Sequence, residues 1–130
     1  MRIMIDTNVL LSALVFRSKK MALILEKAAE EHTMVLCSYV IDEFCSVVTR
    51  KSQKYSSAID TIFANLSYEM VYTPKRQENL PDIRDEKDKP ILAAAIAADV
   101  DIIVTGDKDF YDVDIERPQI LSPADFLGKY

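Results

Sequence analysis

Histidine and cysteine, the residues that most transition-metal sites need, are scarce in this chain. One histidine, His32, and two cysteines, Cys37 and Cys45, occur in 130 residues, and the cysteines do not form a CxxC pair. Proteins bind zinc through clusters of histidine and cysteine, so this inventory argues against a zinc site. Two free thiols suit a reducing compartment, and we therefore expect the protein to be cytoplasmic.

Long apolar runs are missing as well. Because no stretch of 18 apolar residues occurs, the sequence predicts no membrane-spanning helix. The apolar opening, MRIMIDTNVLLSALVF, is interrupted by Asp6 and Asn8, and no small-residue cleavage site follows it. We therefore expect it to be part of the folded protein and not a signal peptide. The sequence has no repeats or low-complexity stretches, so we expect one domain over residues 1–130.

The chain also lacks an excess of basic residues. Lysine and arginine total 16 against 21 aspartates and glutamates, for a formal net charge of −5 at pH 7. Indiscriminate binding of nucleic acids is driven by cationic groups on phosphates, so this balance disfavours it. A bound divalent cation would invert the field locally, however, so a phosphate substrate is still compatible with the sequence.

Short apolar runs alternate with helix-forming segments along the chain. Strands are predicted at residues 2–5, 33–37, 69–72, 102–104 and 119–121. Helices are predicted at residues 7–16, 21–31, 38–50, 58–66, 91–98 and 124–127. Residues 51–57 are predicted as a turn, and the charged segment 73–87 as a surface loop. Strands that alternate with helices favour βαβ units, so we predict an α/β fold with a mostly parallel sheet covered on both faces.

Two aspartates stand where predicted strands end. Asp6 follows the strand at residues 2–5, and Asp107 follows the strand at residues 102–104. Right-handed crossovers place the carboxyl ends of parallel strands along one edge of a sheet, and ligands of α/β sheets bind outside that edge. Each aspartate also has a purely structural explanation, because aspartate is a good helix N-cap and a common turn residue.

Two further acids belong to predicted helices. Glu43 lies at the edge of the apolar face of its helix, where the structural alternative is a carboxylate that reaches water from the rim. Asp88 begins the segment DKPILAAAIAA, where the proline in the first turn makes N-capping the structural alternative. Asp85, three residues before Asp88, and Asp109, in TGDKDF, are peripheral candidates for the same site.

Taken together, the four acids predict a cation site. Carboxylates that share one crevice repel each other, and the pKa of each rises unless a cation lies between them. An all-oxygen site without histidine or cysteine selects a hard ion, Mg²⁺ or Mn²⁺. Such ions bind substrate phosphates and activate water, so phosphodiester hydrolysis is the reaction that these residues suit best.

Several blocks of the sequence resemble those of PIN-domain nucleases. The resemblance rests on IDTNVLLSAL, on the acidic helix with Glu43 and on RDEKDKPILAAAIAADVDIIVTGDKDF, and it extends over most of the chain. Within that family, the sequence is most similar to the VapC-like single-domain toxins of bacterial and archaeal toxin–antitoxin pairs. The resemblance implies a three-layer α/β/α sandwich and a Mg²⁺- or Mn²⁺-dependent endoribonuclease.

The resemblance also implies which residues form the site. The family's catalytic and metal-binding acids fall on Asp6, Glu43, Asp88 and Asp107. Asn8 and Thr105 fall on the adjacent polar positions and are expected to position the substrate. RNA and an antitoxin protein are the partners that the resemblance implies, and a homodimer is a candidate assembly.

Two other functions stay open on the sequence. A PIN-like scaffold would bind RNA or a protein partner without cutting, and the net charge of −5 is compatible with that role. A phosphatase of the haloacid-dehalogenase type would use Asp6 as a covalent nucleophile and GDKDFYD as its metal motif. That chemistry requires a second aspartate two residues after the nucleophile, where this chain has Asn8.

Overall fold

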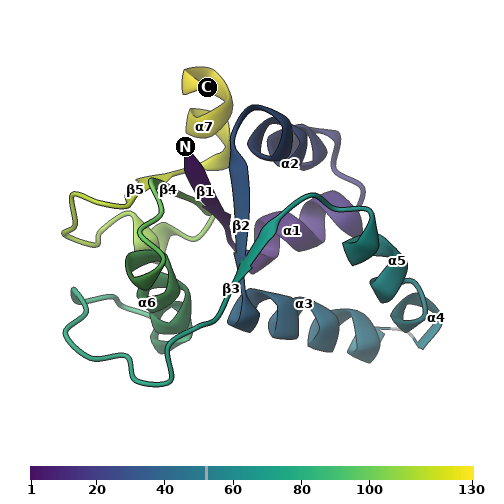
Figure 1. The fold of residues 1–130 in the computed structure, drawn as a ribbon, viewed down its shortest axis with the longest axis horizontal. Coiled ribbons are helices and arrows are strands. Elements are labelled where there is room, and N and C mark those ends of the chain that lie inside the picture. The colour runs from purple at the N-terminus through teal and green to yellow at the C-terminus, as the bar shows by residue number, and fades with distance from the viewer. Residues whose placement is uncertain (52) are drawn as a thin grey trace.

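The computed structural model describes residues 1–51 and 53–130, in which five strands are separated by helices (Figure 1). The strands are β1 (Arg2–Ile5), β2 (Thr33–Cys37), β3 (Glu69–Val71), β4 (Ile102–Val104) and β5 (Gln119–Leu121). The α-helices are α1 (Thr7–Leu14), α2 (Lys19–Glu31), α3 (Ser38–Lys51), α4 (Gln53–Ser56), α5 (Ile59–Ala64), α6 (Lys89–Ala97) and α7 (Pro123–Lys129). Two 3-10 helices, η1 (Glu86–Asp88) and η2 (Lys108–Phe110), lie on either side of α6 and β4 in the sequence.

The strands form one parallel sheet in the order β3-β2-β1-β4-β5. The chain runs outward from β1 to β2 and β3, then crosses back to β4 and β5 on the other side of β1. The strand order therefore reverses between β1 and β4, and the crevice beyond the carboxyl ends at such a reversal is where open α/β sheets bind ligands. In Figure 1, α1 and α2 lie on one side of the sheet and α6 on the other, which confirms the predicted three-layer sandwich.

The centre of the sheet forms the core because helices cover both of its faces. Ile3, Met4 and Ile5 of β1 are all 0% exposed, and Val35 and Ile103 of the neighbouring strands are equally buried. Strands buried on both faces are apolar throughout and do not alternate with polar residues, as these sequences show. Burial of each large side chain of this kind contributes about 1.5–3 kcal/mol to folding. A rigid core therefore holds the strand ends that carry the candidate site.

Some helix boundaries differ from the sequence prediction. Residues 51–57, predicted as a turn, contain the short helix α4, and α3 extends to Lys51; Ser52 lies outside the described residues. Helix α6 begins at Lys89, two residues before the predicted start, and includes Pro90 in its first turn. Proline is tolerated there because its missing N–H would have no acceptor within the helix. None of the helices in the described part of the chain is long and apolar enough to cross a membrane.

Candidate functional site

Asp6 and Thr105 are neighbours because they follow adjacent strands in the same register. Ile5 of β1 pairs with Val104 of β4, so the next residue of each strand extends beyond the same edge of the sheet. The Thr105 hydroxyl donates a 2.7 Å hydrogen bond to Asp6 Oδ2, and the Thr7 backbone N–H donates one of 2.7 Å to Asp6 Oδ1. These two bonds hold a carboxylate that is only 4% exposed in a single orientation.

Thr105 also orients Asp107. Its hydroxyl accepts a 3.0 Å hydrogen bond from the Asp107 backbone N–H, and Asp107 Oδ1 accepts one of 2.9 Å from the Asp109 N–H. The Tyr111 hydroxyl donates a 2.7 Å hydrogen bond to the Thr105 carbonyl oxygen. The segment TGDKDF indicated a turn at this place, without specifying these bonds. It gave no signal for Tyr111, which η2 brings back toward the strand end.

Asp88 occupies the N-cap position of α6 without acting as a cap. Its backbone has φ −88° and ψ −15°, a helical conformation, and its side chain makes no capping hydrogen bond within the described chain. A capping residue needs an extended backbone to turn its side chain toward the first helical N–H groups. Asp88 is the last residue of the 3-10 turn η1, which keeps its backbone helical. Asp85 caps that turn, since its Oδ1 accepts a 3.0 Å hydrogen bond from the Lys87 N–H.

The Asp88 carboxylate is therefore buried without full hydrogen bonding. The residue is 7% exposed, and its Oδ2 atom has no hydrogen-bond partner among the described residues. Buried polar atoms are normally satisfied, and an unpaired one costs free energy. The unsatisfied oxygen thus leaves Asp88 with a free acceptor for a ligand.

A pocket of about 200 Å³ brings the four predicted acids together. Its lining includes Asp6 after β1, Glu43 on α3, Asp88 before α6 and Asp107 before η2. The other lining residues are Thr7, Asn8, Leu11, Val47, Asp85, Lys87 and Ile91. Thr105 lies behind Asp6 and supports it by hydrogen bonding, and it is not itself one of the lining residues.

Two details of the pocket concern residues other than the aspartates. Glu43 lies one turn after Tyr39, whose hydroxyl donates a 3.4 Å hydrogen bond to Glu43 Oε2. Thr7 is a pocket residue that the sequence analysis did not single out. It is buried, and its hydroxyl has no hydrogen-bond partner in the part of the chain that the structure describes. Its one sequence signal is its position between Asp6 and Asn8.

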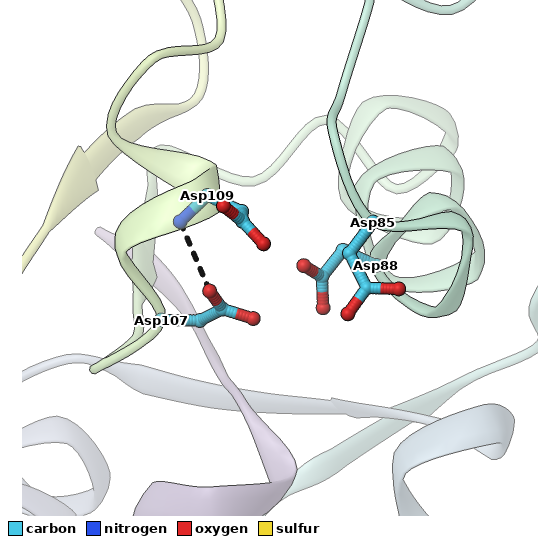
Figure 2. Close-up of side chains that lie close together, drawn as sticks. All are labelled: Asp85, Asp88, Asp107 and Asp109. Carbon is cyan, nitrogen blue, oxygen red and sulfur yellow. Dashed lines mark hydrogen bonds between the residues drawn. The ribbon is translucent and has the colours of Figure 1, made fainter.

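A second, tighter group of carboxylates overlaps this pocket (Figure 2). Asp85, Asp88, Asp107 and Asp109 each offer one oxygen, and these atoms all lie within 4.8 Å of one another. Figure 2 shows the two aspartates of the η1 segment facing the two of the η2 segment across a gap. Asp85 and Asp109, which the sequence analysis gave as peripheral candidates, therefore lie in direct proximity to Asp88 and Asp107.

Burial and nearby negative charge raise the pKa of two carboxylates in this pocket, those of Asp6 and Asp88. The pKa of Asp88 is raised to about 8, first by burial and then by a hydrogen bond to Asp107 and the charges of Asp107, Asp6 and Asp85. Burial also raises the pKa of Asp6, although the hydrogen bonds that this side chain accepts oppose the rise. A divalent cation would relieve the repulsion, and the all-oxygen donors suit a hard ion. The residues therefore fit Mg²⁺ or Mn²⁺.

Without a cation, Asp88 should make the folded protein less stable as the pH rises. Its pKa increases from 3.8 to about 8 on folding, so the folded state binds more protons than the unfolded state between these values. The free energy of unfolding then falls with rising pH, by up to about 1.4 kcal/mol per pH unit. In chelator, Asp88→Asn should melt at a higher temperature than the unchanged protein at pH 8, and the difference should shrink toward pH 5. A difference independent of pH would contradict the burial of this charge.

Comparison with known proteins adds a family match and several similar structures. The family model for the PIN domain matches residues 2–109, and no curated protein matches the sequence. A chain in the crystal structure of VapBC2 from Rickettsia felis, bound to a promoter DNA fragment, superposes with a TM-score of 0.72 at 20% identity. This match covers 94% of the present chain and 98% of the other.

Two further solved structures have the same fold. A chain in the structure of FitAB bound to the IR36 DNA fragment has a TM-score of 0.65 at 16% identity, with 93% and 94% of the two chains covered. A chain of VapBC-1 from nontypeable Haemophilus influenzae has a TM-score of 0.63 at 17% identity, with 95% and 99% covered. At these identities the similarity establishes the fold.

Proposed function

Because this chain belongs to the PIN-domain family, we propose that it is a Mg²⁺- or Mn²⁺-dependent endoribonuclease that hydrolyses RNA phosphodiester bonds. The observation that carries the proposal is the shared pocket of Asp6, Glu43, Asp88 and Asp107 at the reversal of strand order. We propose further that residues 1–130 act as a single catalytic domain. An oxygen-only pocket at this place in an α/β sheet suits a cation and a phosphate better than an uncharged ligand.

The proposed roles follow from how each side chain is held. The ion would be held by Asp6, Glu43, Asp88 and Asp107. The Thr105 hydroxyl orients Asp6 and Asp107 through its two hydrogen bonds. When bound, Mg²⁺ or Mn²⁺ offsets negative charge on phosphate oxygens and lowers the pKa of a water molecule.

Asn8 lies exposed at the pocket, where its side-chain amide can donate a hydrogen bond to an RNA phosphate. The unpaired Thr7 hydroxyl is a second donor in the same pocket.

We also propose a toxin role with an antitoxin protein as partner. It rests on the similarity of this fold to chains of two VapBC structures and of FitAB. A cytoplasmic location and a homodimer are part of the same proposal, which follows the VapC-like resemblance of the sequence. Co-purification with the product of an adjacent gene, and loss of RNA cleavage in that complex, would support the antitoxin.

The direct test is incubation of the purified protein with a labelled single-stranded RNA and Mn²⁺. Internal cuts with new ends are expected, and intact RNA would contradict the proposal. A scaffold that binds without cutting would leave the RNA intact and bind no Mn²⁺ at millimolar concentration in calorimetry. Turnover of a generic phosphomonoester through an aspartyl-phosphate would instead favour the phosphatase alternative.

Thr105→Val should reduce cleavage by about 10- to 100-fold, the usual cost of losing a residue that orients a metal ligand. The change keeps the shape of a fully buried side chain but leaves Asp6 Oδ2 without its donor and the Asp107 N–H without its acceptor. Thr105→Ser retains the hydroxyl and is the matched control. Activity and Mn²⁺ affinity should follow the hydroxyl across the two variants, and equal activity in both would contradict the positioning role.

A further inference from the structure

We propose that Phe16, Arg17, Arg50 and Lys51, at the far ends of α1 and α3, form a binding surface for single-stranded RNA. These four residues are called the basic–aromatic surface below, and none of them lines the acidic pocket. The inference rests on the proposed function, because it assigns the surface to the part of an RNA strand that flanks the bond in the pocket.

Two segments that are distant in the sequence meet at this surface. Phe16 and Arg17 follow α1, and Arg50 and Lys51 are the last residues of α3. The Lys51 Nζ lies 4.0 Å from the centre of the Phe16 ring, which is a cation–π contact. Arg17 and Val48 of α3 both line one hollow of about 590 Å³. The four residues therefore belong to one surface and not to two separate ones.

The exposure and charge of these residues suit a nucleic acid. Phe16 is 57% exposed, and Arg17, Arg50 and Lys51 are exposed as well. None of the three cations forms an ion pair with another described residue. Cations in the last turn of a helix favour its dipole, which accounts in part for Arg50 and Lys51 but not for the ring beside them. Single-stranded nucleic acids are bound by such combinations, in which aromatic rings stack on bases and cations contact phosphates.

The same two helices join this surface to the acidic pocket. Thr7 at the start of α1 and Glu43 of α3 line the pocket, and so do Leu11 and Val47 farther along these helices. Figure 1 shows both helices extending from the carboxyl ends of the strands toward the same side of the molecule. Lys51 lies four residues beyond Val47, or roughly 6 Å along the helix. A stacked strand rises about 3.4 Å per nucleotide, so RNA with one phosphate at the pocket would reach the surface within about two nucleotides.

Fluorescence anisotropy of a labelled oligouridylate, measured in chelator, tests the surface in the absence of cleavage. The metal-free pocket repels phosphates, so binding under these conditions should depend on the basic–aromatic surface. Lys51→Gln, a change at an exposed residue, should weaken binding. It should also reduce the slope of log Kd against log salt concentration by about 0.7, the value for one phosphate contact of a single strand. Arg50→Gln should have the same two effects.

The aromatic part of the surface has a different signature. Phe16→Ala should weaken binding by about fivefold or more, the usual cost of a lost stacking contact. It should leave the salt slope unchanged, because the ring carries no charge. Phe16→Trp should bind at least as well as the unchanged protein, whereas Phe16→Leu, which keeps an apolar side chain without a ring, should bind as weakly as Phe16→Ala. Equal binding by Phe16→Leu and Phe16→Trp would contradict stacking.

Lys129→Gln is the matched control for Lys51→Gln. The Lys129 Nζ also lies over an aromatic ring, 5.5 Å from the centre of Tyr130. It belongs to α7, which Figure 1 places at the opposite end of the molecule from α3. The control changes the net charge by the same amount, and its affinity and salt slope should equal those of the unchanged protein. Equal weakening by Lys129→Gln and Lys51→Gln would reduce the effect to net charge and overturn the surface.

No binding of the oligouridylate, or binding that Phe16→Ala and Lys51→Gln leave unchanged, would also overturn the surface. If these two variants keep RNA binding but lose the co-purifying antitoxin, the surface belongs to a protein partner instead. The ribonuclease proposal fails separately. RNA that binds through this surface but stays intact with Mn²⁺ would support the surface and refute the ribonuclease. RNA that is cut, with binding unaffected in the variants, would support the ribonuclease and refute the surface.

Discussion

Asp6→Asn should abolish RNA cleavage while the protein stays folded. Asparagine is as good an N-cap as aspartate, and its side-chain oxygen can still accept the hydrogen bond from the Thr7 N–H, so α1 keeps its cap. The variant loses the negative charge that the cation requires. Since loss of a residue that merely supports a metal ligand costs 10–100-fold, loss of a ligand should reduce kcat/KM by more than about 100-fold.

The melting temperature separates this catalytic effect from a structural one. Burial raises the pKa of Asp6, which means that its charge is unfavourable in the metal-free protein. In chelator, Asp6→Asn should therefore melt no lower than the unchanged protein. Asp42→Asn is the matched control, because it makes the same chemical change on an exposed residue of α3, next to Glu43 and outside the pocket lining. It should retain full activity. An Asp6→Asn variant that cuts RNA at a tenth of the normal rate or faster would refute the proposed site.

Removal of divalent metal should stop cleavage completely, and Mg²⁺ or Mn²⁺ should restore it. The reason lies in the pocket itself, where carboxylates at close range repel each other and repel RNA phosphates unless a cation is bound. Binding should also stabilise the fold, by about 2.7 kcal/mol when free Mn²⁺ is at 100 times its Kd. Cleavage assays and thermal melts with chelator, and then with added metal, measure both effects in one preparation.

The same metal dependence should vary with pH in a defined direction. Because the pKa of Asp88 is raised to about 8, protons compete with the ion for this carboxylate below that pH. The apparent Kd for Mn²⁺ should therefore fall as the pH rises from 6 to 8, and Asp88→Asn should weaken binding and flatten the dependence. Cleavage that persists in chelator, or a melting temperature that Mn²⁺ does not change, would contradict a metal-dependent site.

Much of the fold could be predicted because its signals are local. The runs at residues 2–5, 33–37 and 102–104 are apolar throughout, which is what strands buried on both faces require, and they became β1, β2 and β4. Their alternation with helices indicated a parallel sheet. The helix boundaries near residue 51 and at Lys89 were less accurate. The polar residues after Lys51 carry no clear stop signal, whereas Pro90 did signal the first turn of α6 and the predicted start was only two residues late.

The candidate site was predictable in part. Asp6 and Asp107 could be recognised from their places after strands, and Glu43 and Asp88 were weaker candidates on predicted helices. The family resemblance implied the same four acids. The fit of this set to its proposed roles stays a prediction, although all four residues line one pocket. Thr7 and Tyr111 were missed, because nothing in their local sequence distinguishes an unpaired or supporting hydroxyl from an ordinary one.

Local sequence patterns were thus sufficient for the α/β class, the strand-end acids and the chemistry that carboxylates without histidine favour. Only the tertiary structure decided which acids lie together. The register of β1 and β4 placed Thr105 next to Asp6. Because the backbone of Asp88 is helical, its side chain does not cap α6 and lines the pocket. The crossover from β3 through α6 to β4 then brought Asp85 and Asp88 opposite Asp107 and Asp109. Such distances depend on how distant segments pack, and a residue's immediate neighbours in sequence do not specify them.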